Sequence, residues 1–413
     1  MITPSFSLTA TERVLPKLAL DFTTASLDSR VTFTRTTGAS NPATYVNSSG
    51  VVTVATNNQP RFDYDPVTLA CKGLLIEESR TNLMTYSSDY SNAIWGTKSG
   101  ISLASGVAAP DVSTSTLVEN TSAGTRYVGQ TATVTTATAY TATVYMKKGT
   151  TNIGAMSVVE SPNQGFWTFD LNTGVVGNNV VSSKASTASI TDAGGGWYRC
   201  SITITTAATS ISVRILPVTS VSVATGAVGD NINVWGAQLE AGAFATSYIP
   251  TTTAALTRNA DVATMTGTNF SDWFNASEGT FACKFQLKST SQVSTSMLSA
   301  NGGSTNNRIE IGLRSTGTNV SVVTVSAATT AILDFGSPTT NVTNQTIAYK
   351  ENSFAGAKNG GTIGTDSAGT IPTVSVLDIG SRASSAFCNG WIQNVNYWPQ
   401  RVTNNEAQAF SKE

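Results

Sequence analysis

The sequence of 413 residues contains no histidine. Histidine is the usual base beside a serine or cysteine nucleophile, and it is a frequent metal ligand. Its absence excludes Ser-His and Cys-His catalysis and every histidine-based metal site. The chain also lacks a GxxxxGK[ST] phosphate loop, and the glycines at 194–196 stand outside the strand–helix context that a dinucleotide site needs. We therefore predict neither a cofactor nor a metal.

Charged residues are scarce as well, at 12% of the chain, against about 25% in typical soluble domains. The 24 basic and 25 acidic residues leave a net charge of -1, so the chain has no basic field that would bind nucleic acid. Threonine, serine, asparagine and glycine must then supply the polar surface. Because β-branched residues fit a pleated surface, this composition favours strands over helices.

Long apolar runs are missing too. No stretch approaches the roughly 20 apolar residues of a membrane-spanning helix, and the beginning of the chain shows no signal-peptide pattern. We expect synthesis and folding in the cytoplasm, without membrane insertion. The four cysteines, Cys71, Cys200, Cys283 and Cys388, are far apart and form no CxxC pair. Buried free thiols are expected, with two disulfides as the alternative.

Short alternating runs fill the middle of the chain. In 140–148 the apolar residues fall on one strand face, and Tyr145 falls on the other face with two threonines. Residues 165–177 predict two strands joined by a turn at 170–174. Further strand runs are 195–206, 210–218 and 232–240. Many short strands separated by Gly and Asn turns predict a β-sandwich or jelly roll over 84–255.

The rest of the chain is also rich in strand patterns. The polar passage at 247–265 is expected to connect two modules. Strand runs then follow at 279–287, 307–315, 319–327, 345–360, 374–382 and 390–399. Residues 402–412 form the one predicted helix. Thr403 or Asn404 can cap it, and Glu406 lies near its positive N-terminal end.

We therefore predict an all-β chain of three parts. Residues 1–83 have few periodic apolar runs and are expected to form an irregular, β-containing anchor segment. A jelly-roll module follows at 84–255. A second β-sandwich module at 256–413 ends in the short helix.

Two aromatic residues are candidates for sugar binding. Tyr145 and Trp167 lie on predicted strands that can form one sheet face, and aromatic rings stack on sugar rings, although core packing is their commoner use. Carboxylate pairs are the catalytic arrangement that survives the missing histidine. Glu160, Asp170 and Glu240 lie in or beside predicted strands, with solvated or ion-paired side chains as the simpler explanation.

Two further sets of polar residues have simple explanations. Glu310 shares a strand face with Arg308, which predicts a surface ion pair. Asp366, Asn301 and Asn306 carry the oxygen ligands that calcium prefers. They lack EF-hand spacing, and turn chemistry explains them equally well.

An ordered set of short stretches spans residues 60–265. They are PRFDYDP (60–66), CKGLLIEE (71–78), RTNL (80–83), YSNAIW (90–95), GWYRC (196–200), WGAQLEAG (235–242) and TSYIPT (246–251). The set resembles a family of bacteriophage and prophage virion proteins described as head spike fibres or tail-fibre-like proteins. The middle module is similar to the jelly rolls of carbohydrate-binding modules.

The C-terminal part carries a second resemblance. SEGTF (277–281), the Asn359-Gly360 pair after an alternating strand, and GWI (390–392) before the final helix are its cues. They make the region from 270 onward similar to a concanavalin-A-like or laminin-G-like sandwich. Such sandwiches often serve as scaffolds, so this resemblance does not assign a sugar site.

These resemblances imply a phage structural protein on the virion surface, either a capsid decoration or a head fibre or spike. They imply major capsid or tail proteins as partners, a homotrimer, and weak binding of host surface glycans. They supply no catalytic residue. Two alternatives stay open: a tail-fibre receptor-binding lectin or adhesin, and a polysaccharide depolymerase that uses two carboxylates.

Overall fold

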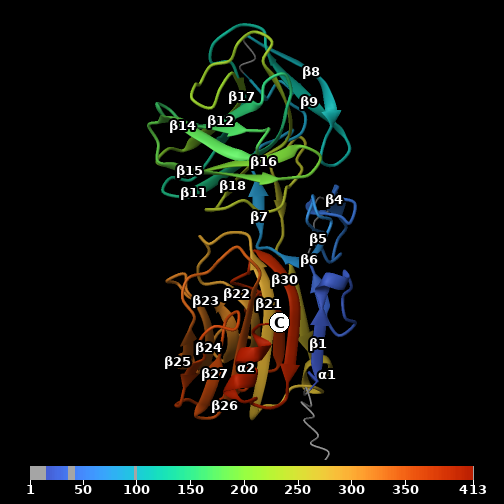
Figure 1. The fold of residues 1–413 in the computed structure, drawn as a ribbon, viewed down its shortest axis with the longest axis vertical. Helices are drawn as coiled ribbons and strands as arrows, with labels where there is room; N and C mark the ends of the chain where they lie inside the picture. Colours follow the sequence, from blue (N-terminus) through green and yellow to red (C-terminus); the bar gives the residue numbers. More distant parts are fainter. Residues whose placement is uncertain (1–14, 36–41, 97–99, 413) are drawn as a thin grey trace, which may run out of the picture.

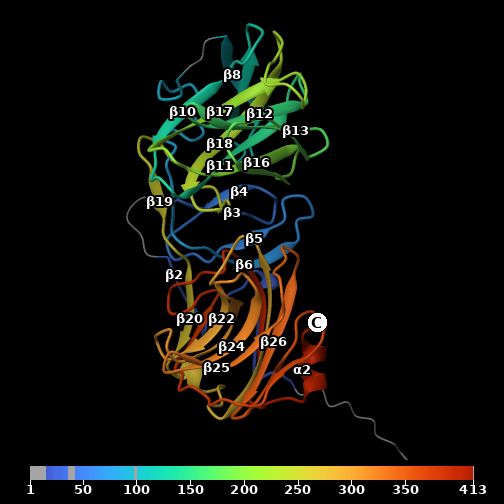
Figure 2. The same cartoon turned by 90° about the vertical axis from the view of Figure 1, so that its left-hand side faces the viewer.

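The computed structural model describes residues 15–35, 42–96 and 100–412, and strands make up nearly all of its regular structure. The all-β class predicted from the sequence is confirmed. Two β modules lie one above the other along the long axis of the molecule, and strands from the beginning of the chain run beside and between them (Figures 1 and 2). Among the described residues, no helix is long and apolar enough to cross a bilayer.

The middle module consists of two antiparallel sheets. The five-stranded sheet has the order β10 (Val128–Thr133), β17 (Ser210–Val218), β12 (Ile153–Glu160), β13 (Asn163–Asp170) and β14 (Val175–Ser182). The six-stranded sheet has the order β15 (Ser186–Asp192), β16 (Trp197–Thr205), β11 (Ala139–Lys148), β18 (Asn231–Ala241), β9 (Thr114–Asn120) and β8 (Ile101–Ala108). Alternation directs Val144 of β11 and Cys200 of β16 into the core between the sheets, where they meet Met156 of β12.

The C-terminal module is a second sandwich. Its eight-stranded sheet has the order β28 (Gly364–Asp366), β27 (Ser353–Gly356), β26 (Thr343–Lys350), β21 (Glu278–Leu287), β30 (Gly390–Trp398), β6 (Cys71–Ile76) and β5 (Phe62–Tyr64), and β1 (Leu18–Asp21) also pairs with β30. The seven-stranded sheet has the order β2 (Thr32–Thr34), β20 (Val262–Thr266), β29 (Val376–Ile379), β22 (Ser296–Asn301), β23 (Arg308–Leu313), β24 (Asn319–Val325) and β25 (Ala328–Asp334).

The described residues contain three short helical elements beside the strands: η1 (Phe22–Thr24), α1 (Thr268–Ser271) and α2 (Asn404–Phe410). The predicted C-terminal helix is confirmed as α2. Thr403 is its N-cap, and the side chain of Glu406 accepts a hydrogen bond from the Thr403 backbone, which completes a capping box.

The first 83 residues contribute strands to the C-terminal module. Three of their strands join the eight-stranded sheet and one joins the seven-stranded sheet. Leu18, Phe22 and Ile76 are buried in the core of that sandwich. β3 (Ala43–Val46) pairs with β4 (Val52–Ala55), and β7 (Arg80–Asn82) pairs with β19 (Leu256–Arg258). Residues 1–14 of the predicted anchor lie outside the described residues, and the predicted domain limits stay a prediction.

A buried group of five charged side chains, which we call the junction cluster, lies between the two modules. Its members are Arg35, Arg61, Glu77, Arg258 and Asp261, and none of these side chains is exposed to solvent. Glu77 Oε2 lies 2.8 Å from Arg61 Nη2 and 3.0 Å from Arg258 Nη1. Asp261 Oδ1 lies 2.9 Å from Arg35 Nη1, and its other oxygen pairs with Arg61. The cluster therefore links strand ends that are far apart in the chain.

The junction cluster also holds the connection between the modules. Ser247 donates from its backbone nitrogen and from its hydroxyl to the two oxygens of Glu77, both at 2.7 Å. Lys288 Nζ lies 2.7 Å from Glu77 Oε1. Burial alone would raise the pKa of Glu77, but the charges of Arg258, Lys288 and Arg61 outweigh burial and hold the pKa well below its ordinary value. Its stabilisation is therefore present at neutral pH and is lost as the pH falls below about 4.3 toward the folded-state pKa.

We predict that Glu77→Gln lowers the free energy of unfolding by about 3–5 kcal/mol, because it leaves buried arginines without their counter-charge. Asp28→Asn is the matched control, since Asp28 pairs with Arg30 at 2.8 Å on a partly exposed surface. The control should change stability by about 0–1 kcal/mol. Urea unfolding followed by tryptophan fluorescence measures both, and equal losses in the two variants would contradict a structural role for the cluster.

Candidate functional site

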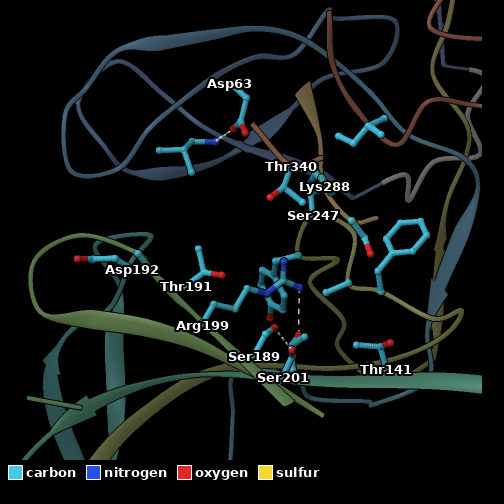
Figure 3. A pocket seen from close by; sticks show the side chains of 18 of the residues that line it. Asp63, Thr141, Ser189, Thr191, Asp192, Arg199, Ser201, Ser247, Lys288 and Thr340 are labelled. Carbon is cyan, nitrogen blue, oxygen red and sulfur yellow. Dashed lines mark hydrogen bonds between the residues drawn. The ribbon is translucent and has the colours of Figure 1, made fainter. Parts of the chain in front are cut away.

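A cavity of about 760 Å³ opens where the two modules and the N-terminal strands meet. Its walls come from several parts of the chain, including residues within 243–248 and residues 340 and 341. β15, β16 and β11 form one wall, residues 44–72 form a second, and residues 286–291 with Trp391 form a third. Figure 3 shows Asp63, Lys288 and Thr340 on one side of this space and Ser189, Ser201 and Thr141 on the other. We call it the junction cavity.

The wall from the middle module carries several serine and threonine hydroxyl groups. Strand alternation directs the apolar residues of β11 and β16 into the core and the polar residues into the cavity. Ser201 lies opposite Thr143 on one neighbouring strand and opposite Ser189 on the other. The Ser189 and Ser201 hydroxyl oxygens are 2.6 Å apart. Thr141 and Thr203 form a second pair at 2.8 Å. These hydrogen bonds orient groups that can each donate and accept.

The side chain of Arg199 extends from this wall, and two hydrogen bonds hold it in one orientation. Its Nη1 donates to the Thr246 carbonyl at 2.6 Å, and its Nη2 donates to the Thr143 hydroxyl at 3.0 Å. The guanidinium carbon lies 5.4 Å from the centre of the Tyr145 ring, which is within the range of a cation–π contact. Its Nε is buried and has no hydrogen-bond partner in the part of the chain that the structure describes.

The opposite wall combines an indole ring with charged groups. Lys72 Nζ lies 3.3 Å from the centre of the Trp391 ring, and Lys288 Nζ lies 5.3 Å from it. Trp391 Nε1 donates to Asp63 Oδ2 at 2.8 Å, and the Val46 backbone nitrogen donates to Asp63 Oδ1 at 2.6 Å. Burial lowers the pKa of Lys72 to about 8, and Asp63 opposes this change while Lys288 adds to it.

The structure separates the two aromatic candidates. Tyr145 lines the junction cavity but is only 7% exposed, because it packs against Trp235 and Tyr248. Trp167 lies on β13 in the five-stranded sheet, outside the cavity lining, and its Nε1 donates to the Ser186 hydroxyl at 2.9 Å. The prediction that they share one sheet face is wrong, since Tyr145 belongs to the six-stranded sheet.

Sequence reasoning missed most of the cavity. The strand run 195–206 was predicted, but Arg199, Ser201 and Thr203 within it were assigned no role. The sequence did offer a signal that Lys72 lies at a site, because it is a single cation beside the apolar run 73–76. The sequence offered no such signal for Trp391, because its contacts with Lys72 and Asp63 come from the distant N-terminal segment.

The three candidate catalytic carboxylates each have specific partners. Glu160 pairs with Lys184, and its Oε2 accepts from the Thr206 hydroxyl at 2.8 Å. Asp170 accepts from the Asn172 backbone nitrogen at 2.8 Å in the turn after β13. Glu240 is fully buried and accepts from the backbone nitrogen of Thr246 at 2.8 Å. None of these three carboxylates lines the junction cavity.

The remaining polar candidates also have partners. Arg308 pairs with Glu310 at 2.6 Å, although Glu310 is 4% exposed and the pair is not on the open surface as predicted. Asn301 donates to Asp378 Oδ2 at 2.6 Å, whereas Asp366 accepts from the Ala368 backbone nitrogen at 3.1 Å.

Within the described ranges, no group of three or more Cys, Asp or Glu side chains is placed to hold a metal ion. All four cysteines are free thiols. Cys200, Cys283 and Cys388 are buried, and Cys71 is half-buried.

Comparisons with known proteins found similar solved structures. The scan against protein-family models and the search of curated proteins found no match. Carbohydrate-binding modules are among the similar structures. The CBM40 of the Ruminococcus gnavus IT-sialidase bound to α2,3-sialyllactose is 13% identical and covers 33% of this chain and 84% of its own, with a TM-score of 0.29. Domain 4 of an extracellular arabinanase from Geobacillus stearothermophilus, in complex with arabinotriose, is 11% identical and covers 37% and 73%, with a TM-score of 0.28.

A third similar structure is the binding domain of botulinum neurotoxin serotype D. It is 13% identical and covers 36% of this chain and 40% of its own, with a TM-score of 0.29.

We predict that Lys72 titrates with a midpoint near pH 8, because its ammonium is largely withdrawn from water. An exposed lysine titrates at about 10.4. Reductive ¹³C-methylation of the lysines, followed by NMR from pH 6 to 12, measures each midpoint, and Lys72→Arg identifies the resonance by its loss. A Lys72 midpoint at the ordinary value would show that water reaches the ammonium freely.

Proposed function

We propose that this chain is a glycan-binding structural protein displayed on the surface of a phage particle. One observation carries the binding role: a cavity of about 760 Å³ has an ordered wall of serine and threonine hydroxyls, with cationic side chains on its rim. Ligand sites commonly have volumes of about 300–1,000 Å³, so the junction cavity has the size of a small-molecule or oligosaccharide site.

The hydroxyl wall suits a saccharide for a simple reason. Sugar hydroxyls donate and accept hydrogen bonds, and so do the side chains of Ser189, Ser201 and Thr203. Thr141 is buried and donates to the Gly242 carbonyl, so it orients Thr203 instead of facing a sugar. The hydrogen bonds at 2.6 and 2.8 Å within this wall reduce the ordering that binding would require. Water competes for the same groups, so we expect weak binding at one site. Many copies on one particle would convert weak sites into strong attachment.

The family resemblance supports display on a virion. Its motif residues build the junction: Arg61, Glu77 and Ser247 belong to the junction cluster or contact it. Gln238 and Glu240 of a further motif are buried beside them and hydrogen-bond to each other at 2.7 Å. These contacts favour a structural role for the motifs. We propose attachment to major capsid or tail proteins, a homotrimeric unit, assembly in the host cytoplasm and contact with host surface glycans. The receptor-binding lectin of a tail fibre is the nearest alternative.

We propose binding without catalysis. The proposal is supported by the partners of Glu160, Asp170 and Glu240, which are held by ion pairs or hydrogen bonds outside the cavity. Burial would raise the pKa of Glu160, but hydrogen bonds from Lys184 and Ala207 lower it. Asp170 has a lowered pKa as well, because backbone hydrogen bonds from Asn172 and Thr173 outweigh burial. A general acid for glycoside hydrolysis needs the opposite shift.

We predict that Ser189→Trp abolishes binding on a glycan array, because an indole at this exposed position fills the space above the hydroxyl wall. Thr131→Trp is the matched control. It makes a similar change at an exposed position of β10, outside the cavity lining. The control should keep the glycan profile of the unmodified protein.

Two outcomes would contradict the glycan-binding proposal. One is the absence of binding by the unmodified protein at millimolar glycan. The other is an unchanged profile in Ser189→Trp, provided that its circular dichroism spectrum shows a folded protein.

We predict that peptides of this chain are present in purified particles of the phage or prophage that encodes it. Quantitative mass spectrometry gives the copy number, where hundreds of copies indicate capsid decoration and a few indicate a tail device. The complex released from particles should have about three times the chain mass of 42.9 kDa. Particles that lack the chain would overturn the virion assignment.

A further inference from the structure

We infer that the ligand of the junction cavity is an anionic saccharide whose carboxylate or sulfate group pairs with Lys72, an inference that rests on the proposed function. Three cations line the cavity, namely Lys72, Arg199 and Lys288, against two carboxylates, Asp63 and Asp192. The lining thus has one more cation than carboxylates, and Glu77, behind the lining, pairs with Lys288. This lining attracts an anion more strongly than a neutral sugar.

Lys72 is the cavity cation for which the described residues supply neither an ion pair nor a hydrogen-bond acceptor. Lys288 has a carboxylate partner, because its Nζ lies 2.7 Å from Glu77 Oε1. Arg199 is held by the Thr246 carbonyl and the Thr143 hydroxyl, and its Nε, which has no partner among the described residues, is buried. Lys72 contacts the Trp391 ring and forms no ion pair within the described residues.

The nearby carboxylates, Asp63 and Asp65, form no direct ion pair with Lys72 in the described part of the chain. Asp63 accepts from Trp391 Nε1 and from the Val46 backbone nitrogen, at 2.8 and 2.6 Å. Asp65 accepts from the backbone nitrogens of Val67 and Thr68, at 3.0 and 2.8 Å. Both acids favour the charged form of Lys72, but burial and Lys288 outweigh them, so its pKa falls to about 8. A ligand anion would add the counter-charge that these groups do not supply.

The geometry also orients the ligand. Figure 3 shows Asp63 and Lys288 on the side of the cavity opposite Ser189 and Ser201. Trp391 belongs to the wall of Asp63, because its Nε1 donates to that carboxylate, and Lys72 lies over its ring. The acidic group would lie against Lys72, and the neutral hydroxyls of the sugar would face the serine and threonine wall. Because Tyr145 and Trp391 are each less than 9% exposed, charge and hydrogen bonds supply the recognition instead of ring stacking.

The pH dependence follows from the same charge. An anionic ligand binds the protonated form of Lys72 more tightly than the neutral form. The affinity is therefore highest below the pKa of about 8 that Lys72 has in the free protein. It falls as the pH rises through the higher pKa that Lys72 has in the complex. The charged groups that face Lys72 are Asp63, Asp65 and Lys288.

Isothermal titration calorimetry on the full chain tests the inference. The probes are neutral, uronate-bearing and sulfated tetrasaccharides, measured at pH 7 and pH 10.5. At pH 7 at least one anionic probe should bind about tenfold more tightly than the neutral probe, and this advantage should shrink at pH 10.5. Lys72→Met should remove the advantage at both pH values. Lys72→Arg should keep it without the pH dependence, because arginine stays charged.

Lys148→Met is the control for a general loss of positive charge. Lys148 is exposed at the end of β11, outside the cavity lining, and its Nζ contacts Asn172 at 2.6 Å. This variant should keep the anionic advantage. Equal affinity for neutral and anionic probes, or an advantage that survives Lys72→Met, would overturn the inference and leave glycan binding intact. Absence of binding by all three probes would overturn the proposed function itself.

Discussion

Two carboxylates, Glu77 and Asp261, are fully buried among three arginines at the point where the modules meet. Removing such charges from water is unfavourable, so the arrangement persists only while every partner is in place. The partners come from strand ends of the N-terminal segment and from the connection between the modules. The junction cluster therefore determines where the modules lie, and the walls of the junction cavity depend on that placement.

Strand patterns predicted the local structure well. The alternation in 140–148 became β11, with the apolar face in the core, and the turn at 170–174 separates β13 from β14. These features depend on neighbours in the chain. The partners of β1 and β6 are distant in the chain, because Leu18 pairs with Tyr397 and Leu74 pairs with Ile392 in a sheet built mainly from the C-terminal part. A pattern within one segment cannot name such a partner.

The residues of the junction cavity were also hard to predict, because their neighbours are distant in the chain. Tyr145 was identified as an aromatic residue on the outward face of its strand, and it does line the cavity. Trp167 has equal aromatic character but lies in the other sheet, and pairing order decides that difference. The polar passage at 247–265 was predicted as a connection, yet it carries Arg258 and Asp261, which are fully buried. Their burial depends on ion pairs with Glu77, Arg35 and Arg61, which lie far away in the chain.

The position of β1 beside β30 has a consequence for the order of events during synthesis. β1, β5 and β6 leave the ribosome long before β21 and β30, the strands that complete their sheet. The middle module has all of its own strands at an earlier stage, so it can close while the N-terminal strands still lack their neighbours. The chain thus matures from its centre outward, and its earliest apolar strands wait for the last one to be translated.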